Sequence, residues 1–187
     1  MAFLAEEAVA ALGFARVGRD VKISDRVSIY NPERISIADH VRIDDFCILS
    51  AGDGGIDLGS YVHIACYASL IGREKIVLRD FAGLSGRVSV YSSSEDYSGT
   101  CLTNPTVPEE YRKPVHGRVL FARHVIVGAG SVILPGVTLG LGASVGALTL
   151  VAKDLEPFGI YLGVPARKVG TRAQDLLELE KRLGGLL

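Results

Sequence analysis

The chain has 187 residues and a formal net charge of −1, from 20 Lys and Arg against 21 Asp and Glu. Because 48% of its residues are hydrophobic, it can bury a core, which argues against a disordered tail. The balanced charge argues against a nucleic-acid-binding or polybasic membrane protein, and no apolar stretch approaches the roughly 18 residues that a membrane span needs.

Residues 1–16 are predicted to form a helical cap, because Phe3, Leu4, Ala8 and Leu12 make one apolar stripe at helical spacing. This segment has no basic cluster of the kind found in secretory signals, so we expect a cytoplasmic protein. The three cysteines share no disulfide-framework or CxxC spacing, which predicts reduced thiols.

An apolar residue recurs at every sixth position, in six groups of three. The groups are Val17, Ile23, Ile29; Ile37, Ile43, Leu49; Leu58, Ile64, Leu70; Leu78, Leu84, Val90; Phe121, Val127, Ile133; and Leu139, Val145, Val151. A period of six matches neither a helix nor plain strand alternation, but it suits a short strand followed by a corner. Three strands close one triangular coil, and coils stacked about 4.8 Å apart can hydrogen-bond above and below. The sequence therefore predicts an all-β solenoid, a parallel β-helix of about six triangular coils over residues 17–170.

Two segments lie outside the repeat. Residues 91–118 interrupt the fourth coil with polar and turn-forming residues, and a long loop of this kind is usually functional. Residues 171–187 carry leucines at helical spacing opposite charged residues, which predicts a C-terminal helix that caps the solenoid or contacts another subunit.

Two stretches of the repeat are more specific than its period. They are Ile-Val-Gly-Ala-Gly-Ser-Val-Ile-Leu-Pro-Gly-Val-Thr-Leu-Gly from Ile126 to Gly140, and Gly-Val-Pro-Ala-Arg from Gly163 to Arg167. With the hexads, they resemble the hexapeptide-repeat acyltransferases, nearest the galactoside and maltose acetyltransferases and the sugar acetyltransferases of polysaccharide biosynthesis. The resemblance implies a left-handed β-helix, a homotrimer with active sites between subunits, and acetyl-CoA as co-substrate. It also implies that the acceptor enters near the insertion.

The resemblance assigns the cofactor to five residues. Ala129 and Ala147 match small corner positions where the pantetheine arm approaches the backbone, and Ala152 and Lys153 match the next contact. Lys153 suits a phosphate, and Arg167 matches a position near the nucleotide end.

The resemblance does not extend to the catalytic base. The position at which galactoside acetyltransferases carry a histidine is Glu95 here, followed by Asp96. His63, one coil below the insertion, is an alternative proton acceptor, and His116 at the exit of the insertion is another. An amine acceptor needs less help from a base than a hydroxyl does, so the choice of base stays open.

Polar groups of the insertion are candidates for binding the acceptor, namely Ser94, Tyr97 and Asn104. The histidine spacing offers no set of three ligands, so no metal is expected. We predict acetyl transfer from acetyl-CoA to an amino or hydroxyl group of a sugar or sugar nucleotide. The alternative hypothesis is an inactive β-helical scaffold or binding subunit that has lost the family histidine.

Overall fold

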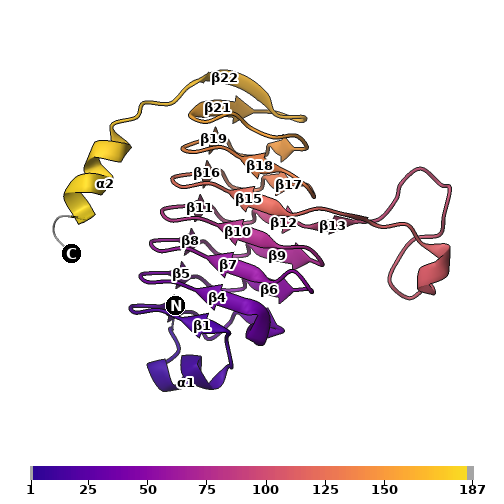
Figure 1. The fold of residues 1–187 in the computed structure, drawn as a ribbon, viewed down its shortest axis with the longest axis horizontal. Coiled ribbons are helices and arrows are strands. Elements are labelled where there is room, and N and C mark those ends of the chain that lie inside the picture. The colour runs from indigo at the N-terminus through magenta and orange to yellow at the C-terminus, as the bar shows by residue number, and fades with distance from the viewer. Residues whose placement is uncertain (1, 185–187) are drawn as a thin grey trace.

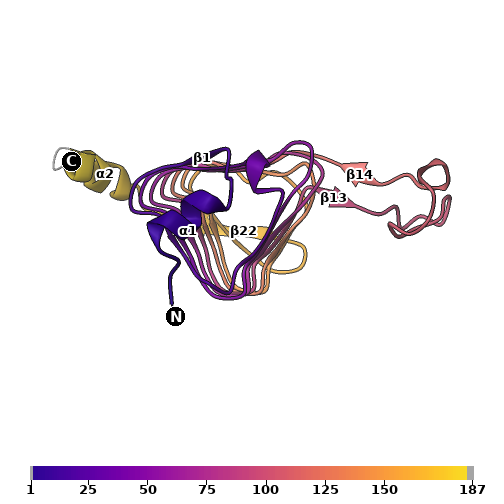
Figure 2. The same ribbon diagram turned by 90° about the horizontal axis from the view of Figure 1, so that it is seen from below.

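The computed structural model describes residues 2–184 and forms a triangular prism of stacked coils (Figures 1 and 2). Met1 and residues 185–187, the end of the predicted C-terminal helix, lie outside the described residues. The predicted left-handed parallel β-helix is confirmed as a β-solenoid with parallel sheets on its three sides. Within the described residues, no helix has the length and apolar character that a bilayer crossing requires.

Three sheets form the sides of the prism, and consecutive strands along the chain belong to different sheets. Sheet 1 contains β1 (Arg16–Val17), β4 (Ile35–Ile37), β7 (Ile56–Leu58), β10 (Ile76–Leu78), β15 (Val119–Phe121) and β18 (Thr138–Leu139). Sheet 2 contains β2 (Lys22–Ile23), β5 (Arg42–Ile43), β8 (His63–Ile64), β11 (Gly83–Leu84), β16 (Ile126–Val127), β19 (Ser144–Val145), β21 (Gly159–Leu162) and β22 (Arg167–Thr171). Sheet 3 contains β3 (Ser28–Tyr30), β6 (Ile48–Ala51), β9 (Ser69–Gly72), β12 (Ser89–Tyr91), β17 (Val132–Ile133) and β20 (Leu150–Val151).

The hexad residues point into the prism and form one continuous core. From Ile37 to Val151 they are almost completely buried, and the small residues between them, such as Val41 and Ala82, share the narrow interior. Burial raises the pKa of the Cys47 thiol in this core to about 11. The first coil is less covered, because Val17 lies in an end layer that has a neighbour on one side only.

The structure has about seven coils, one more than the six groups predicted. Leu155 bridges to Leu139, and Tyr161 pairs with Val145, so the last winding is sixteen residues long rather than eighteen. This shorter winding interrupts the six-residue period, so the hexad pattern alone does not detect the seventh coil.

Short helices lie at both ends of the solenoid. Helix α1 (Glu6–Ala11) sits below the first coil, where Val9 reaches the core (Figure 1). At the other end β22 pairs antiparallel with β21, and α2 (Leu176–Gly184) turns back down one corner of the prism. Residues 171–175, predicted as part of the helix, instead complete β22 and the connection.

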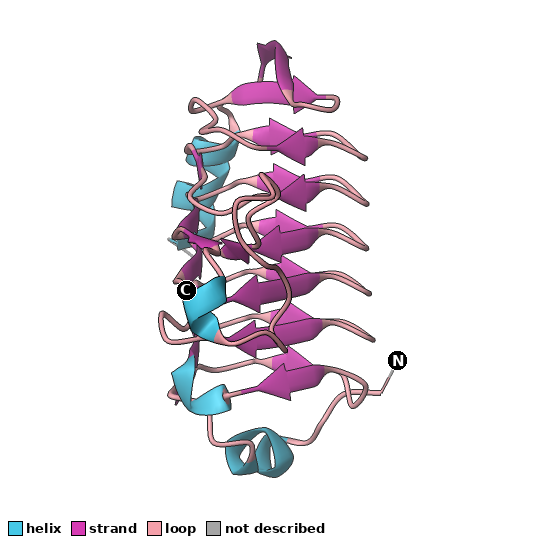
Figure 3. Cartoon of the chain, turned by 90° about the vertical axis from the view of Figure 1, so that its right-hand side faces the viewer, coloured by secondary structure: helices cyan, strands magenta, loops and turns pink. Residues whose placement is uncertain are grey.

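Residues 92–118 of the predicted insertion form an arm that projects sideways from the fourth coil (Figure 2) and is seen end-on in Figure 3, whereas Tyr91 completes β12. Its base is an antiparallel ladder of β13 (Ser93–Ser94) and β14 (Val115–His116), and its tip contains a 3-10 turn, Glu109–Tyr111. A second 3-10 turn, Pro32–Arg34, precedes β4. The buried Ser92 anchors the ladder by donating its hydroxyl to the Glu74 carbonyl at 2.6 Å.

The three corners of the prism differ in their side chains. The first corner, between sheets 1 and 2, stacks the rings of His40, Tyr61, Phe81 and His124. The second corner, between sheets 2 and 3, contains Phe46, Tyr67, Arg87, Gly130 and Leu148, all with positive φ. The third corner, between sheets 3 and 1, carries the arm.

Candidate active site

A column of small residues runs up the second corner from Ser85. The register of sheet 2 places the residues after its strands in one column, Asp44, Ala65, Ser85, Gly128 and Gly146. Above Ser85 the column contains Gly128 and Gly146, and the side chain of Leu162, which follows Tyr161 in the next layer, lies over Gly146. These glycines are required by close coil packing, since a Cβ on Gly128 would lie 2.5 Å from the Ala147 backbone nitrogen. The column can therefore accept an extended ligand against its backbone.

The predicted cofactor residues fall at two corners. Ala129 and Ala147 are exposed at the second corner, next to the glycine column, with the Leu148 N–H donating to the Ala129 carbonyl at 2.9 Å. Arg167 begins β22 above the same corner, where it pairs with Leu162. Ala152 and Lys153 are exposed at the third corner, two coils above the arm. One side of the prism therefore separates Lys153 from Ala129 and Ala147 within a single chain.

Glu95 lies near the base of the arm and pairs with Arg112 across it. Both side chains are largely enclosed, at 24% and 16% exposure. Oε1 of Glu95 accepts from Arg112, whereas Oε2 of Glu95 and Nε of Arg112 are buried with no partner among the described residues. An unpaired buried acceptor is costly, and a ligand or a second subunit that donates a hydrogen bond to Oε2 would remove that cost.

The neighbouring Asp96 has a different environment. The backbone N–H and hydroxyl of Ser98 bind its carboxylate at 2.7 and 2.9 Å, which lowers the pKa of Asp96 to about 2. A carboxylate with so low a pKa is a poor proton acceptor near neutral pH. Tyr97 is 88% exposed, and Ser94 lies in β13 with its hydroxyl on the Glu95 carbonyl. Asn104 is at the tip, where its side chain accepts from the Thr106 backbone at 3.0 Å.

His63 is held on the face of sheet 2 by Asp44. Nε2 of His63 lies 2.9 Å from Oδ2 of Asp44, and Nε of Arg42 donates to Oδ1 at 2.7 Å. Burial opposes ionisation of Asp44, but hydrogen bonds from Arg42 and His63 outweigh it and lower its pKa below the ordinary value. The ring of His63 is thus oriented by a carboxylate, one coil below Ser85.

The other three histidines have structural partners. Nδ1 of His116 is 2.8 Å from the Ser93 hydroxyl at the base of the arm. His40 and His124 are the two ends of the first-corner ring stack. Across residues 2–184, no three His, Cys, Asp or Glu side chains gather as a metal-binding group.

Sequence reasoning did not single out Ser85, Arg112 or Asp44. Ser85 and Asp44 follow hexad residues directly, so the coil register would have placed them in one column, one residue before the predicted small positions Ala129 and Ala147. No sequence pattern indicated Arg112 as the partner of Glu95, because the residues of the arm do not repeat.

No family model matches the chain. A dTDP-4-amino-4,6-dideoxy-D-glucose acyltransferase of Escherichia coli is 50% identical over 180 residues, which are 96% of this chain and 94% of that protein. AntD, an N-acyltransferase of Bacillus cereus solved with dTDP and 3-hydroxybutyryl-CoA, is 45% identical with a TM-score of 0.94 over 97% of this chain and 95% of its own. A maltose O-acetyltransferase of Clostridium difficile is 17% identical with a TM-score of 0.61, over 90% of this chain and 75% of its own, and shares the fold.

Proposed function

This chain belongs to the hexapeptide-repeat acyltransferases, and we propose that it transfers an acyl group from acyl-CoA to the 4-amino group of dTDP-4-amino-4,6-dideoxyglucose. The main support for this choice of acceptor is the 50% identity to an acyltransferase named for it, over nearly the full length of both chains. AntD has also been solved with that sugar nucleotide and coenzyme A. The chain is an acyl-CoA-dependent enzyme, so the inactive-scaffold alternative is set aside.

The glycine column at the second corner supports a site for the acyl donor. The pantetheine arm would lie along the glycine column and beside Ala129 and Ala147, with its thioester toward Ser85. Arg167, above that corner, and Lys153 are the candidate partners for the phosphates of coenzyme A. Acetyl-CoA is the predicted donor, and the 3-hydroxybutyryl-CoA bound to AntD makes a longer acyl chain the natural comparison.

The reaction forms one bond and breaks another. The lone pair of the sugar amine attacks the thioester carbonyl, the C–N bond forms, and the C–S bond breaks to release coenzyme A. The nitrogen loses one proton and the departing sulfur gains one, so the step balances without an external reagent. Glu95 would bind the amine through Oε2 and accept or relay this proton, with Arg112 fixing the carboxylate. His63, oriented by Asp44, is the second candidate acceptor.

Two positions studied in AntD support this assignment. AntD has been solved with one serine or one aspartate replaced, and these are numbered one below Ser85 and Glu95 of this chain. We propose Ser85 and Glu95 as their counterparts on the premise that the offset of one is the same at both positions; an offset of two in the arm would make Asp96 the counterpart of the aspartate. Asp96 then anchors the turn of the arm, and Ser94, Tyr97 and Asn104 remain proposed acceptor contacts.

We propose that the protein assembles as a homotrimer in which neighbouring subunits share each site. Ser85 lies at the second corner, whereas Glu95 is on an arm that leaves the third corner and points away from the prism (Figure 2). A site that uses both needs the arm of one subunit laid against the second corner of the next. The same separation applies to Lys153 and Ala147. We further propose that the trimer is cytoplasmic and supplies modified sugars for polysaccharide biosynthesis.

Thiol release from acetyl-CoA and 3-hydroxybutyryl-CoA tests the function. We expect turnover with dTDP-4-amino-4,6-dideoxyglucose and an amide product by mass spectrometry. Galactose, maltose and dTDP-glucose, which lack the amine, are the control acceptors. Release with a hydroxyl acceptor but not with the amine would overturn the proposal, as would the failure of coenzyme A to bind in calorimetry.

Glu95→Gln should lower kcat/KM for the sugar nucleotide by about tenfold or more, because the amide keeps the contact with Arg112 but removes the charge and the proton acceptor. His63→Ala, measured beside it, should cost less. Glu110→Gln is the matched control, since Glu110 is an exposed carboxylate on the same arm. If neither Glu95→Gln nor His63→Ala reduces turnover by tenfold, neither residue is the proton acceptor. The amine proton would then pass to the substrate itself or to the departing thiolate.

A further inference from the structure

The second corner carries a ladder of arginines and aromatic rings below Ser85. The guanidinium of Arg26 lies 5.5 Å from the Phe46 ring centre, the Phe46 and Tyr67 rings stack at 5.0 Å, and Arg87 lies 5.6 Å from Tyr67. The turn residues of successive coils bond to one another, so the ladder is rigid in its backbone. We call Arg26, Phe46, Tyr67 and Arg87 the corner ladder.

The corner ladder is exposed and its charge is not neutralised. Phe46 and Tyr67 are 43% and 52% exposed, which is high for aromatic rings. Within residues 2–184, neither Arg26 nor Arg87 forms an ion pair. Two carboxylates stand beside the ladder, but Asp45 already accepts from the Ser24 hydroxyl, and Asp25 lies in the outermost coil.

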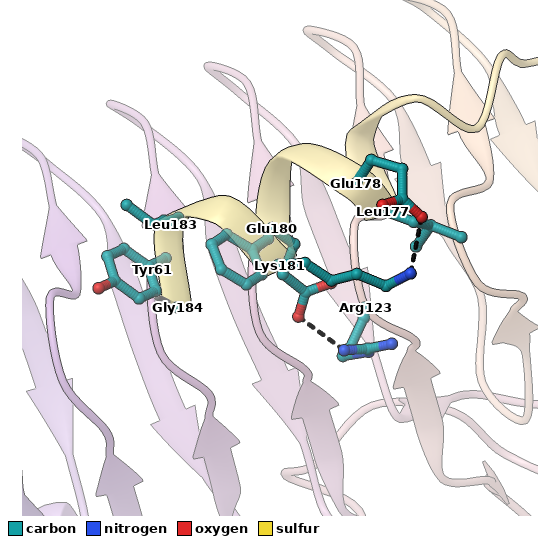
Figure 4. Close-up of a pocket in the computed structure, with 9 residues that line it drawn as sticks. Tyr61, Arg123, Leu177, Glu178, Glu180, Lys181, Leu183 and Gly184 are labelled. Carbon is teal, nitrogen blue, oxygen red and sulfur yellow. Dashed lines mark hydrogen bonds and ion pairs between the residues drawn. The ribbon is translucent and has the colours of Figure 1, made fainter. Parts of the chain in front are cut away.

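The first corner carries a similar column of stacked rings, but there other parts of the chain cover the rings. Its ring stack ends on carboxylates, with Asp20 3.1 Å from His40 and Glu180 2.7 Å from His124. Helix α2 lies along it and leaves a groove of about 450 Å³ over Tyr61 (Figure 4). The corner ladder has arginines at both ends in place of these carboxylate-bound histidines, and no helix of residues 2–184 covers it. Its chemistry suits an anion with a planar ring.

We propose that the corner ladder binds the nucleoside diphosphate of the sugar-nucleotide acceptor, an inference that rests on the proposed function. In the proposed function the acyl donor lies along the glycine column above Ser85, so the acceptor approaches the reacting atoms from the opposite side. The ladder begins at Arg87, in the coil of Ser85, and continues away from the glycine column toward the N-terminal coils. A sugar placed at Ser85 therefore directs its diphosphate and base along this corner.

Each part of the ladder has a role in this arrangement. Arg87 binds the diphosphate, because a guanidinium offers several N–H donors in a fixed plane and its stacking on Tyr67 orients it before the ligand arrives. The exposed edges of Tyr67 and Phe46 contact the pyrimidine and deoxyribose. Arg26 closes the far end and adds positive charge.

Calorimetric titration of the intact protein with dTDP tests the proposal. Arg87→Gln and Tyr67→Asn should each weaken dTDP binding by about tenfold or more, with the affinity for coenzyme A unchanged. Asparagine is chosen because it tolerates the positive φ of Tyr67. The affinity of Arg87→Gln should also fall less steeply with added salt than that of the wild type. Arg19→Gln and Tyr61→Asn, an exposed arginine and a first-corner ring, are the matched controls.

The outcomes separate this inference from the proposed function. If the wild type acylates the amino sugar and the ladder variants bind dTDP as it does, the ladder assignment is wrong and the function stands. If light scattering shows that the ladder variants change the oligomeric mass, the ladder is a subunit contact and the inference is overturned. A wild type that neither binds dTDP nor acylates the dTDP-sugar would overturn both.

Discussion

Ala147→Leu is expected to lower kcat/KM for acyl-CoA by about 100-fold, which corresponds to about 3 kcal/mol of lost binding. The exposed Ala147 borders the glycine column, so a leucine side chain there would fill the path proposed for the pantetheine arm. The affinity for dTDP should not change, since the corner ladder lies below Ser85. Thiol-release kinetics measure kcat/KM for acyl-CoA. Separate titrations with coenzyme A and dTDP measure the affinity for each ligand.

Ala10→Leu is the matched control, because Ala10 is exposed on α1 at the opposite end of the solenoid. Equal loss in both variants, or an unchanged affinity for coenzyme A in Ala147→Leu, would contradict the placement of the donor.

The same variant tests the shared site. If the protein is the proposed trimer, co-expression of Ala147→Leu with Glu95→Gln should restore activity in about a quarter of the sites of the mixed assembly, namely those that combine an intact corner with an intact arm. A site built within one subunit would recover nothing.

The solenoid could be predicted from the sequence because its core is periodic. Ile43, Ile64 and Leu84 each point inward because each starts the same corner, and a charged residue at any of them would be buried without a partner. The seventh coil was missed where this period fails, at the short winding to Leu155. Aromatic Tyr161 fills the end layer, where the interior is no longer constrained by a full coil above.

The site was less predictable, for two physical reasons. The arm folds through long polar side chains, and the pairing of Glu95 with Arg112 spans 17 residues with no repeat to indicate it. The corner ladder, unlike the arm, does lie within the repeat. Its residues follow the coil length, but Phe46, Tyr67 and Arg87 share neither charge nor polarity, so a search for one residue type does not find them.

Phe121→Ala is expected to destabilise the protein by about 3–5 kcal/mol and to lower Tm on the order of 10 °C. Phe121 is completely buried in β15, where it pairs with Leu78 below and Leu139 above. The cavity cannot close easily, because hydrogen-bonded coils hold the walls of the prism at a fixed spacing. Calorimetry at one protein concentration measures the change, since Tm of the proposed oligomer would depend on concentration.

The position of Phe121 makes this test specific to a stacked solenoid. Each coil contacts only its neighbours, so a cavity in the fifth coil weakens both adjoining interfaces at the point where the arm rejoins the prism. Hydrogen exchange should therefore rise first in β10, β15 and β18 rather than in the terminal coils. Leu179→Ala, which truncates a leucine that is 59% exposed on α2, should change stability by no more than about 0.5 kcal/mol. Uniform loss of protection along the whole chain would contradict nearest-neighbour stacking, because it would require the coils to unfold as one unit.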